Sequence, residues 1–277
     1  MAAPRARLDA ELVRRGLARS REQAGELVSA GLVTVAGQRA AKPATQVARD
    51  TPIAVSESAE PGYVSRGGHK LAGALAVFGG LRGVAPPGQH SGDLAITGRN
   101  ALDAGASTGG FTDVLLRAGA AHVVAADVGY GQLAWSLRTD PRVTVLDRVN
   151  VRTLEHVTPV PDLVVADLSF ISLTLVLPAL VAAAAPDADF VLLVKPQFEV
   201  GKGRVGAGGV VREVTDRSAA VEKVCRAAAE LGLGVRGVTA SPLPGQAGNV
   251  EYFVWLRRGA PPLEAEQLRR AIEEGPQ

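Results

Sequence analysis

The 277-residue sequence contains a single cysteine, Cys225, and four histidines, none of them at the spacing of a metal site. One cysteine excludes an internal disulfide and a cysteine-rich metal centre, and it favours a reducing compartment. The first 16 residues are charged throughout and lack the apolar segment of a signal peptide. We therefore expect a cytoplasmic protein without a bound metal.

Long uncharged segments are scarce as well, and only one approaches the length of a membrane span. Residues 168–186 carry no charge over 19 residues. Three hydroxyl residues and Pro178 interrupt this segment, acids flank both ends, and no Lys or Arg anchors it. We predict a buried helix of an α/β domain here and no stable membrane association.

The net charge of +2 hides an uneven distribution along the chain. Residues 1–49 hold nine Lys or Arg and four acids, a net charge of +5, so the remainder is mildly acidic. A basic head on an acidic body indicates a polyanion-binding module attached to a second domain. Within the head, apolar spacing predicts helices over 5–16 and from Ser20 to Gly31, then strands at 32–35 and 51–55.

The middle of the chain predicts the domain boundaries. Residues 56–66 read as a hinge because Pro61 and Gly62 break regular structure. We expect a first domain over 1–60, a linker over 61–66 and a second domain over 67–277. A helix is predicted from Arg66 to Phe78, and the Gly- and Pro-rich residues 79–100 are expected to form an exposed connection.

Beyond residue 100, short apolar strands alternate with helices, which predicts a mostly parallel sheet covered on both faces. The expected strands are 101–104, 122–127, 143–147, 163–167 and 190–195, the expected helices 109–118, 131–138, 173–185 and 216–232, and a terminal hairpin joins 235–240 to 251–257. Ligands of such sheets bind at the carboxyl ends of the strands. The residues at or near those ends are Asp103, Asp127, Asp147, Asp167 and Lys195.

Residues 101–116 predict a strand, a small-residue turn and a helix that opens at Ser107 or Thr108. Glycine at 105, 109 and 110 lets backbone approach a ligand, and free helix N–H groups face it. An Asp two residues before the first glycine suits the cationic S-adenosylmethionine better than a dinucleotide. A generic strand-to-helix turn is the alternative. Further along the sheet, Asp127 is the candidate for the cofactor ribose and Asp147 for the adenine edge.

The head resembles an S4 RNA-binding domain over the run Arg7-Leu8-Asp9-x-x-Leu12-Val13-x-x-Gly16-Leu17-Ala18-x-Ser20-Arg21, continued by Ala24, Leu27, Val28, Gly31, Val33, Val35 and Gly37. A positive helix face neutralises phosphates with little sequence selectivity. The alternative is a basic hairpin that binds a protein. The candidate RNA-binding residues are Arg5, Arg7, Arg14, Arg15, Arg19, Arg21 and Lys42.

Five further segments resemble the TlyA family of ribosomal RNA cytidine 2′-O-methyltransferases: Asp103 to Thr112, Ala126 to Leu133, Asp167 to Ser172, Lys195-Pro-Gln-Phe-Glu199 and Gly248-Asn-Val-Glu251. The resemblance implies a Rossmann-like class I methyltransferase, with a mostly parallel seven-stranded sheet and an antiparallel terminal strand, after a small α+β S4 domain. It implies S-adenosylmethionine as cofactor and ribosomal RNA or ribosomal subunits as partner. Its cofactor loop matches Asp103, Gly105, Ser107, Thr108, Gly109, Gly110 and Phe111.

The family's catalytic tetrad matches Lys70, Asp167, Lys195 and Glu251. A sugar hydroxyl is a poor nucleophile at neutral pH, so a base must take its proton, and lysine can do this whereas arginine cannot. Lys195 is the candidate base, Asp167 its orienting partner, and Lys70 and Glu251 hold the ribose.

Other features of the body remain open at this point. Residues 201–209 are either a basic lip for RNA or a loop without a role, and Phe111, Trp135, Phe170 and Phe198 are either a base-stacking platform or core. The rival functions are a non-catalytic RNA-binding or ribosome-assembly factor and a membrane-active hemolysin.

Overall fold

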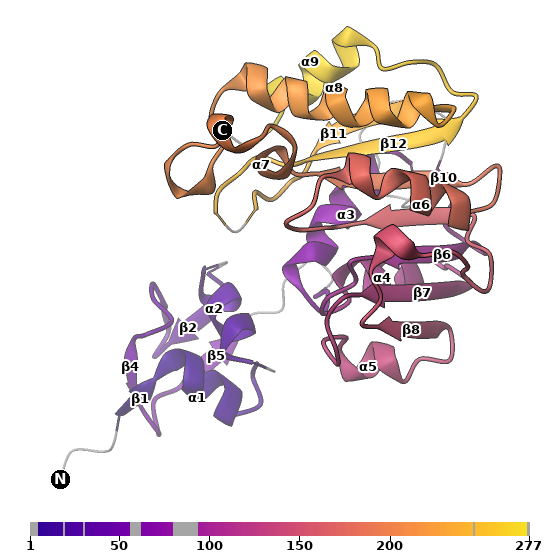
Figure 1. The fold of residues 1–277 in the computed structure, drawn as a ribbon. Helices are drawn as coiled ribbons and strands as arrows, with labels where there is room; N and C mark the ends of the chain where they lie inside the picture. Colours follow the sequence, from indigo (N-terminus) through magenta and orange to yellow (C-terminus); the bar gives the residue numbers. More distant parts are fainter. Residues whose placement is uncertain are drawn as a thin grey trace. The chain divides into compact units, whose positions relative to one another are not determined.

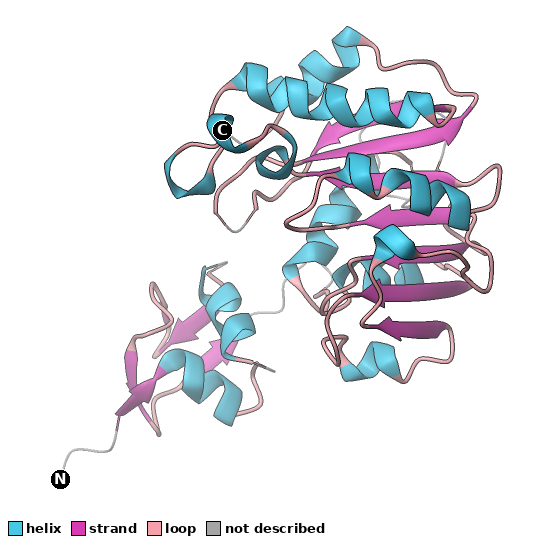
Figure 2. Ribbon diagram, viewed as in Figure 1, coloured by secondary structure: helices cyan, strands magenta, loops and turns pink. Residues whose placement is uncertain are grey.

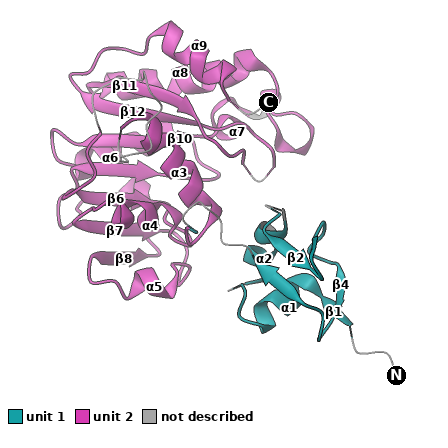
Figure 3. Cartoon of the chain, turned by 180° about the vertical axis from the view of Figure 1, so that it is seen from behind, with its two compact units in different colours: residues 1–62 teal, residues 63–277 magenta. Residues whose placement is uncertain are grey.

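The computed structural model describes residues 5–18, 20–29, 31–55, 62–79, 94–245 and 247–275. The chain divides into two compact units, Met1–Gly62 and Tyr63–Gln277, which we call unit 1 and unit 2 (Figure 3). Tyr63 and Val64, within the predicted linker, pack against the hydrophobic core of unit 2. Of the hinge, residues 56–61 lie outside the described residues, and Arg66 at its end already begins a helix.

Unit 1 is a small α+β fold with two helices near the predicted positions, although residues 5–7 of the helix predicted over 5–16 form a strand instead. The backbone N–H of Gln23 donates to the Ser20 hydroxyl at 3.1 Å, as expected for a helix that opens at Ser20. The strands form two small antiparallel sheets, β1-β4 and β3-β2-β5. The elements are β1 (Arg5–Arg7), α1 (Leu8–Arg14), α2 (Arg21–Ser29), β2 (Val33–Val35), β3 (Gln38–Arg39), β4 (Gln46–Ala48) and β5 (Ile53–Val55).

Unit 2 alternates strands and helices around one large sheet (Figures 1 and 2). Its strands are β6 (Asn100–Ala104), β7 (His122–Asp127), β8 (Val143–Asp147), β9 (Leu163–Ala166), β10 (Asp189–Val194), β11 (Leu233–Ala240) and β12 (Tyr252–Arg258). Its helices are α3 (Arg66–Val77), α4 (Gly110–Arg117), α5 (Trp135–Arg138), α6 (Leu177–Ala183), α7 (Pro196–Glu199), α8 (Val214–Glu230) and α9 (Ala265–Glu273), with 3-10 turns at Val151–Thr153, Leu173–Leu175, Lys202–Arg204 and Ala207–Gly209.

The seven strands lie in the order β11-β12-β10-β9-β6-β7-β8. Neighbours from β10 to β8 are parallel, whereas β12 is antiparallel to both β10 and β11. The prediction of a mostly parallel sheet with an antiparallel terminal strand is therefore confirmed. Because β12 runs the other way, its amino end lies at the same edge of the sheet as the carboxyl ends of the parallel strands.

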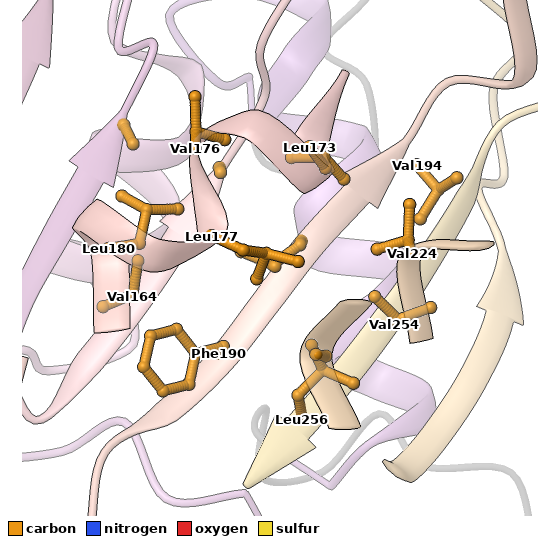
Figure 4. Close-up of a cluster of buried hydrophobic side chains, with 14 of the residues drawn as sticks. Val164, Leu173, Val176, Leu177, Leu180, Phe190, Val194, Val224, Val254 and Leu256 are labelled. Atoms are coloured by element: carbon orange, nitrogen blue, oxygen red, sulfur yellow. The ribbon is translucent and has the colours of Figure 1, made fainter. Parts of the chain in front are cut away.

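Alternation along the interior strand β10 explains why both faces of the sheet are covered. Phe190, Leu192 and Val194 of β10 point into one hydrophobic cluster, together with side chains of α6, α8 and α9, part of which is drawn in Figure 4. Val191 and Leu193 point into the other, against α3 and α4. Period-two alternation with apolar residues on both sides is the pattern of a doubly covered strand.

Three local expectations are corrected. In the connection expected to be exposed over 79–100, Leu94 and Ile96 are buried in the cluster that includes α3, and residues 80–93 lie outside the described residues. The helix expected over 131–138 is only α5, and the one expected over 173–185 is a 3-10 turn followed by α6. No helix within the described ranges is long and apolar enough to cross a bilayer.

Candidate active site and RNA-binding surface

Neighbouring strands bring three of the four tetrad residues to one edge of the sheet. Glu251 precedes β12, Lys195 follows β10, and Asp167 follows β9. These strands are adjacent, in the order β12-β10-β9. The fourth residue, Lys70, comes from α3, whose buried residues include Leu71 and Leu75.

Lys195 is held by the segment that follows β9. Its ammonium nitrogen lies 2.6 Å from Asp167 Oδ1 and donates to the Ser169 hydroxyl at 2.9 Å. The lysine side chain is 10% exposed and that of Asp167 22%. The pair is thus fixed yet still reachable from solvent at its carboxylate.

A second lysine–carboxylate pair lies deeper. Lys70 Nζ donates to Glu251 Oε2 at 2.6 Å, with the side chains 10% and 2% exposed. A buried charge is costly unless it is paired, so each member of this pair depends on the other. The sequence interval of 181 residues between them shows that tertiary structure alone creates the contact.

Asp103 lies near the carboxyl end of β6 and is fully buried. The Thr112 hydroxyl donates to its Oδ2 at 2.6 Å, while its Oδ1 has no partner among the described residues. Burial raises the pKa of Asp103 to about 7, and the nearby carboxylates of Asp167 and Asp127 act in the same direction. Clustered carboxylates with an unpaired oxygen suit a cationic ligand.

The glycine loop fits close packing within the protein. Gly105 has φ +87°, and a Cβ there would lie 2.6 Å from the carbonyl oxygen of Asp167. A Cβ at Gly110 would collide with the Ser65 hydroxyl oxygen and lie 2.7 Å from the Gly68 nitrogen. These glycines therefore let α4 pack against α3 and let the β6 turn approach the β9 turn. The helix opens later than predicted, at Gly110, with Gly109 as its cap.

The other predicted cofactor residues have different surroundings. Asp127 accepts the backbone N–H groups of Ser107 at 2.9 Å and Gly129 at 2.7 Å, so it shapes the loop. Thr108, beside them, is exposed.

Asp147 and Phe111 are already engaged by the protein itself. Asp147 pairs with Arg138, and this contact lowers the pKa of its carboxyl. Phe111 is buried and packs against Phe253 at a ring-centroid distance of 5.9 Å, which makes it a core residue.

A hollow of about 560 Å³ is lined by residues that follow Asp167 and Lys195 in the chain. Phe170 at its rim is 91% exposed with a φ of +64°, and its ring lies 5.3 Å from that of Phe198. The lining consists of Phe170, Ile171, Ser172, Gln197, Phe198, Gly201, Val205, Gly206 and Gly209. Part of the predicted basic lip, residues 201–209, therefore forms one wall. Trp135 is 76% exposed and so does not belong to the hydrophobic core, which was the alternative to a stacking role.

In unit 1, two buried acids organise the basic face. Asp9 accepts both Arg7, at 2.7 Å, and Arg21, at 3.1 Å, through the same oxygen. Glu11 accepts Arg14 at 2.6 Å and Arg15 at 2.8 Å. Hydrogen bonds from Arg14 and then Arg15 lower the pKa of Glu11 to about 2.

The remaining candidate RNA-binding residues differ in how exposed their side chains are and in whether the protein itself binds them. Arg15 also donates to the carbonyl oxygens of Thr51 and Arg49, both at 2.8 Å, and is only 20% exposed. Its guanidinium is thus taken up within unit 1. Arg5 and Lys42 are exposed, and Arg19 lies outside the described residues. Among the described residues, no group of His, Cys, Asp and Glu is arranged to hold a metal ion.

Two family models match the chain, the S4 domain over residues 6–53 and the FtsJ-like methyltransferase over residues 63–258. Together with the fold and the strand-end site, these matches define an S-adenosylmethionine-dependent methyltransferase with an RNA-binding unit. The 16S/23S rRNA (cytidine-2′-O)-methyltransferase TlyA of Mycobacterium tuberculosis is 59% identical over 99% of this chain and 100% of that protein. The chain belongs to the TlyA family, which confirms the resemblance found in the sequence.

Two further relatives carry a different name. Hemolysin A of Brachyspira hyodysenteriae is 34% identical over 89% of this chain and 98% of that protein. A solved structure from Streptococcus thermophilus, described as a candidate hemolysin, has 38% identity and a TM-score of 0.73 over 99% of this chain and 96% of that one. The shared fold of this family thus extends across nearly the whole chain.

Proposed function

We propose that this chain transfers a methyl group from S-adenosylmethionine to the 2′-hydroxyl of a cytidine in ribosomal RNA, with Lys195 as the proton acceptor. The observation that carries this assignment is the placement of two lysine–carboxylate pairs, Lys195–Asp167 and Lys70–Glu251, at one edge of the sheet, each at 2.6 Å. The activity agrees with the rRNA methyltransferase of M. tuberculosis that the chain resembles.

The cofactor half of the site has the chemistry that a cationic ligand needs. S-adenosylmethionine, when bound, supplies a methyl group on a positively charged sulfonium. Asp103, Asp127 and the turn over 105–110 would hold it. Although both oxygens of Asp127 accept backbone N–H groups, each keeps a lone pair for a ribose hydroxyl. Asp147 would reach the adenine edge only by sharing its carboxylate with Arg138.

Lys195 acts on the hydroxyl that receives the methyl group. The O–H bond of the ribose breaks, and the proton passes to the neutral amine of Lys195, which must first release one of its own protons. Asp167 and Ser169 fix the position of the nitrogen throughout. An arginine at this position would keep the charge but could not accept a proton.

The neighbouring residues orient the RNA. Lys70 and Glu251 form a rigid buried pair that positions the ribose, and the hollow beside Phe170 has room for an extruded nucleotide whose base stacks on an exposed aromatic ring. In unit 1, the exposed cations bind phosphates. These are Arg5, Arg7, Arg14, Arg21 and Lys42, and Arg19 is proposed from its sequence position.

We further infer that the partner is an assembled or assembling ribosomal subunit in the cytoplasm. An S4 unit binds through phosphates and RNA shape, which a folded ribosomal RNA presents and a short oligonucleotide does not. The single cysteine supports the same compartment.

The test is methyl transfer from labelled S-adenosylmethionine to ribosomal subunits that lack the mark, followed by mapping of 2′-O-methyl positions. We expect one or a few methylated cytidines with the natural chain, and a loss of about 10²- to 10⁴-fold in rate for Lys195→Ala. Cofactor affinity should stay within a few-fold, because Lys195 lies in the other half of the sheet edge.

A matched control replaces an exposed cation far along the chain, Arg269→Ala on α9, which should leave the rate unchanged. If the natural chain binds subunits but leaves no 2′-O-methyl mark, the protein is a non-catalytic assembly factor. If Lys195→Ala is fully active, another group takes the proton.

A further inference from the structure

Glu199, the last residue of α7, is a buried carboxylate to which the tetrad assigns no role. It is 4% exposed and stands four residues after Lys195. Its Oε1 accepts the backbone N–H of Leu173 at 2.7 Å, and its Oε2 accepts the hydroxyl of Ser172 at 2.5 Å. Lys223 of α8 donates to its carbonyl oxygen at 2.8 Å and lies 3.4 Å from its Oε2. This carboxylate is therefore fully engaged.

These contacts join the two segments on which the Lys195 site depends. Lys195 lies at the start of the segment that ends in Glu199, and its two partners, Asp167 and Ser169, lie in the segment that ends at Ser172. A shift of one segment against the other would lengthen both contacts to the lysine nitrogen. Glu199, at the end of one segment, is bonded to Ser172, at the end of the other. This link lies several residues away from Lys195 and Asp167 in the sequence.

The segment from Asp167 to Ser172 needs such an anchor. Phe170 has a φ of +64°, a conformation that bulky residues rarely adopt and that persists only where surrounding contacts impose it. At one end of the segment the Asp167 N–H donates to the carbonyl oxygen of Ala104 at 3.1 Å. At the other end, Glu199 holds Ser172 and Leu173. The strained residue lies between these two anchors.

We propose that Glu199 is a positioning residue for methyl transfer, which keeps the Asp167–Ser172 segment in the conformation that aligns Lys195 with the ribose hydroxyl. The proposal rests on the function proposed above. Glu199 touches neither the cofactor loop nor the lysine nitrogen, so it acts through Asp167 and Ser169. Its removal should lower kcat and leave cofactor affinity almost unchanged.

The experiment compares Glu199→Ala with Glu199→Gln in the full chain, using labelled S-adenosylmethionine and unmethylated ribosomal subunits. Alanine removes both acceptors, and we expect kcat to fall about 10- to 100-fold, because small misplacements near a reacting group have effects of this size. Glutamine can still accept the Leu173 N–H and bond the Ser172 hydroxyl, so we expect it to restore kcat to within about threefold of the natural chain. Ser172→Ala removes one donor to the Glu199 carboxylate, which keeps the Leu173 N–H and Lys223, so its kcat should lie between those of the two Glu199 variants.

Two readouts separate positioning from loss of folded protein. The dependence of kcat on pH should change in Glu199→Ala, because Lys195 loses part of its fixed surroundings, whereas a smaller folded fraction would scale the profile without moving it. The matched control is Asp189→Asn, a carboxylate 1% exposed at the opposite end of β10 that accepts the Trp255 indole N–H at 2.8 Å. It should lower the melting temperature while kcat per folded molecule stays unchanged.

The proposal is overturned if Glu199→Ala keeps the natural kcat, if Glu199→Gln fails to restore it, or if Asp189→Asn lowers kcat per folded molecule equally. The natural chain and Lys195→Ala are measured in parallel. If these two behave as expected and Glu199→Ala is fully active, only the role of Glu199 fails. If the natural chain transfers no methyl group, the proposed function fails instead.

Discussion

Both units pair carboxylates with cations, but they differ in how far the cation of each pair is buried. In unit 1, Asp9 and Glu11 are buried, while three of the four arginines they hold, all but Arg15, keep much of their side chains in water. Arg7 is 47% exposed, Arg14 50% and Arg21 58%. The buried acid fixes the guanidinium, and the outer side of the guanidinium stays available to a phosphate.

In unit 2 both members of the pair are withdrawn from solvent. Lys70 and Lys195 are each only 10% exposed, and their partners Glu251 and Asp167 are 2% and 22% exposed. Lysine differs from arginine in that its side chain is able to accept a proton in a reaction, which a guanidinium cannot do. Under the function proposed above, one kind of contact serves phosphate binding in unit 1 and proton transfer in unit 2.

Replacing a lysine of unit 2 by arginine and an arginine of unit 1 by lysine should produce the largest difference in methyl-transfer rate. Lys195→Arg keeps the positive charge beside Asp167, and we expect a loss of about 10²- to 10⁴-fold in kcat because the guanidinium cannot take a proton. Arg14→Lys keeps a cation on the surface of unit 1 and should change the rate less than about threefold. Single-turnover methyl transfer measures both, and an active Lys195→Arg variant would mean that charge alone is needed.

One buried acid of unit 2, Asp103, should make stability depend on pH. The native pKa of Asp103 is about 7, above its usual value of 3.8, so the folded chain keeps a proton that the unfolded chain releases between these values. The free energy of unfolding should therefore fall as pH rises from about 4 to about 7, by an amount on the order of 4 kcal/mol at most. Asp103→Asn should lack this fall. Urea unfolding at several pH values tests it, and parallel curves for the two proteins would contradict it.

Arg14 and Arg15 provide a smaller, sharper contrast within unit 1. Arg15→Ala removes bonds to Glu11 and to two carbonyl oxygens, and it should cost about 2 kcal/mol of stability with the salt dependence of RNA binding unchanged. Arg14→Ala should do the reverse, lowering the slope of log affinity against log salt by about one. Thermal unfolding and RNA titrations across salt concentrations distinguish them. A reduced slope for Arg15→Ala would show that it does contact phosphate.

Hydrophobic periodicity predicted the long, regular strands and helices and missed features that depend on tertiary contacts. The strands of unit 2 were located to within two residues because runs rich in β-branched residues and leucine are separated by small breaks. The two- and three-residue strands β1, β3 and β4 were missed, because a segment this short is not enough to show a hydrophobic period. Leu94 and Ile96 were missed because a Gly- and Pro-rich context concealed two apolar side chains that pack on the core.

The strand-end acids were predicted from sequence, but their neighbours were not. Asp103 was expected near a ligand, and the structure places it under the loop, bonded to Thr112. Phe111 was expected at the cofactor and lies in the core. Glu199 is the last residue of the motif Lys195-Pro-Gln-Phe-Glu199. No sequence spacing predicts its contact with Ser172, because that contact depends on how two turns pack.

The sequence by itself determined that this chain has a basic S4 unit, a doubly covered sheet and charged residues at strand ends, since composition and local period specify these features. The tertiary structure alone decided which cation meets which carboxylate. Because β12 enters the sheet antiparallel beside β10, Glu251 comes to the edge where Lys195 and Asp167 end their strands, and α3 brings Lys70 to it across 181 residues.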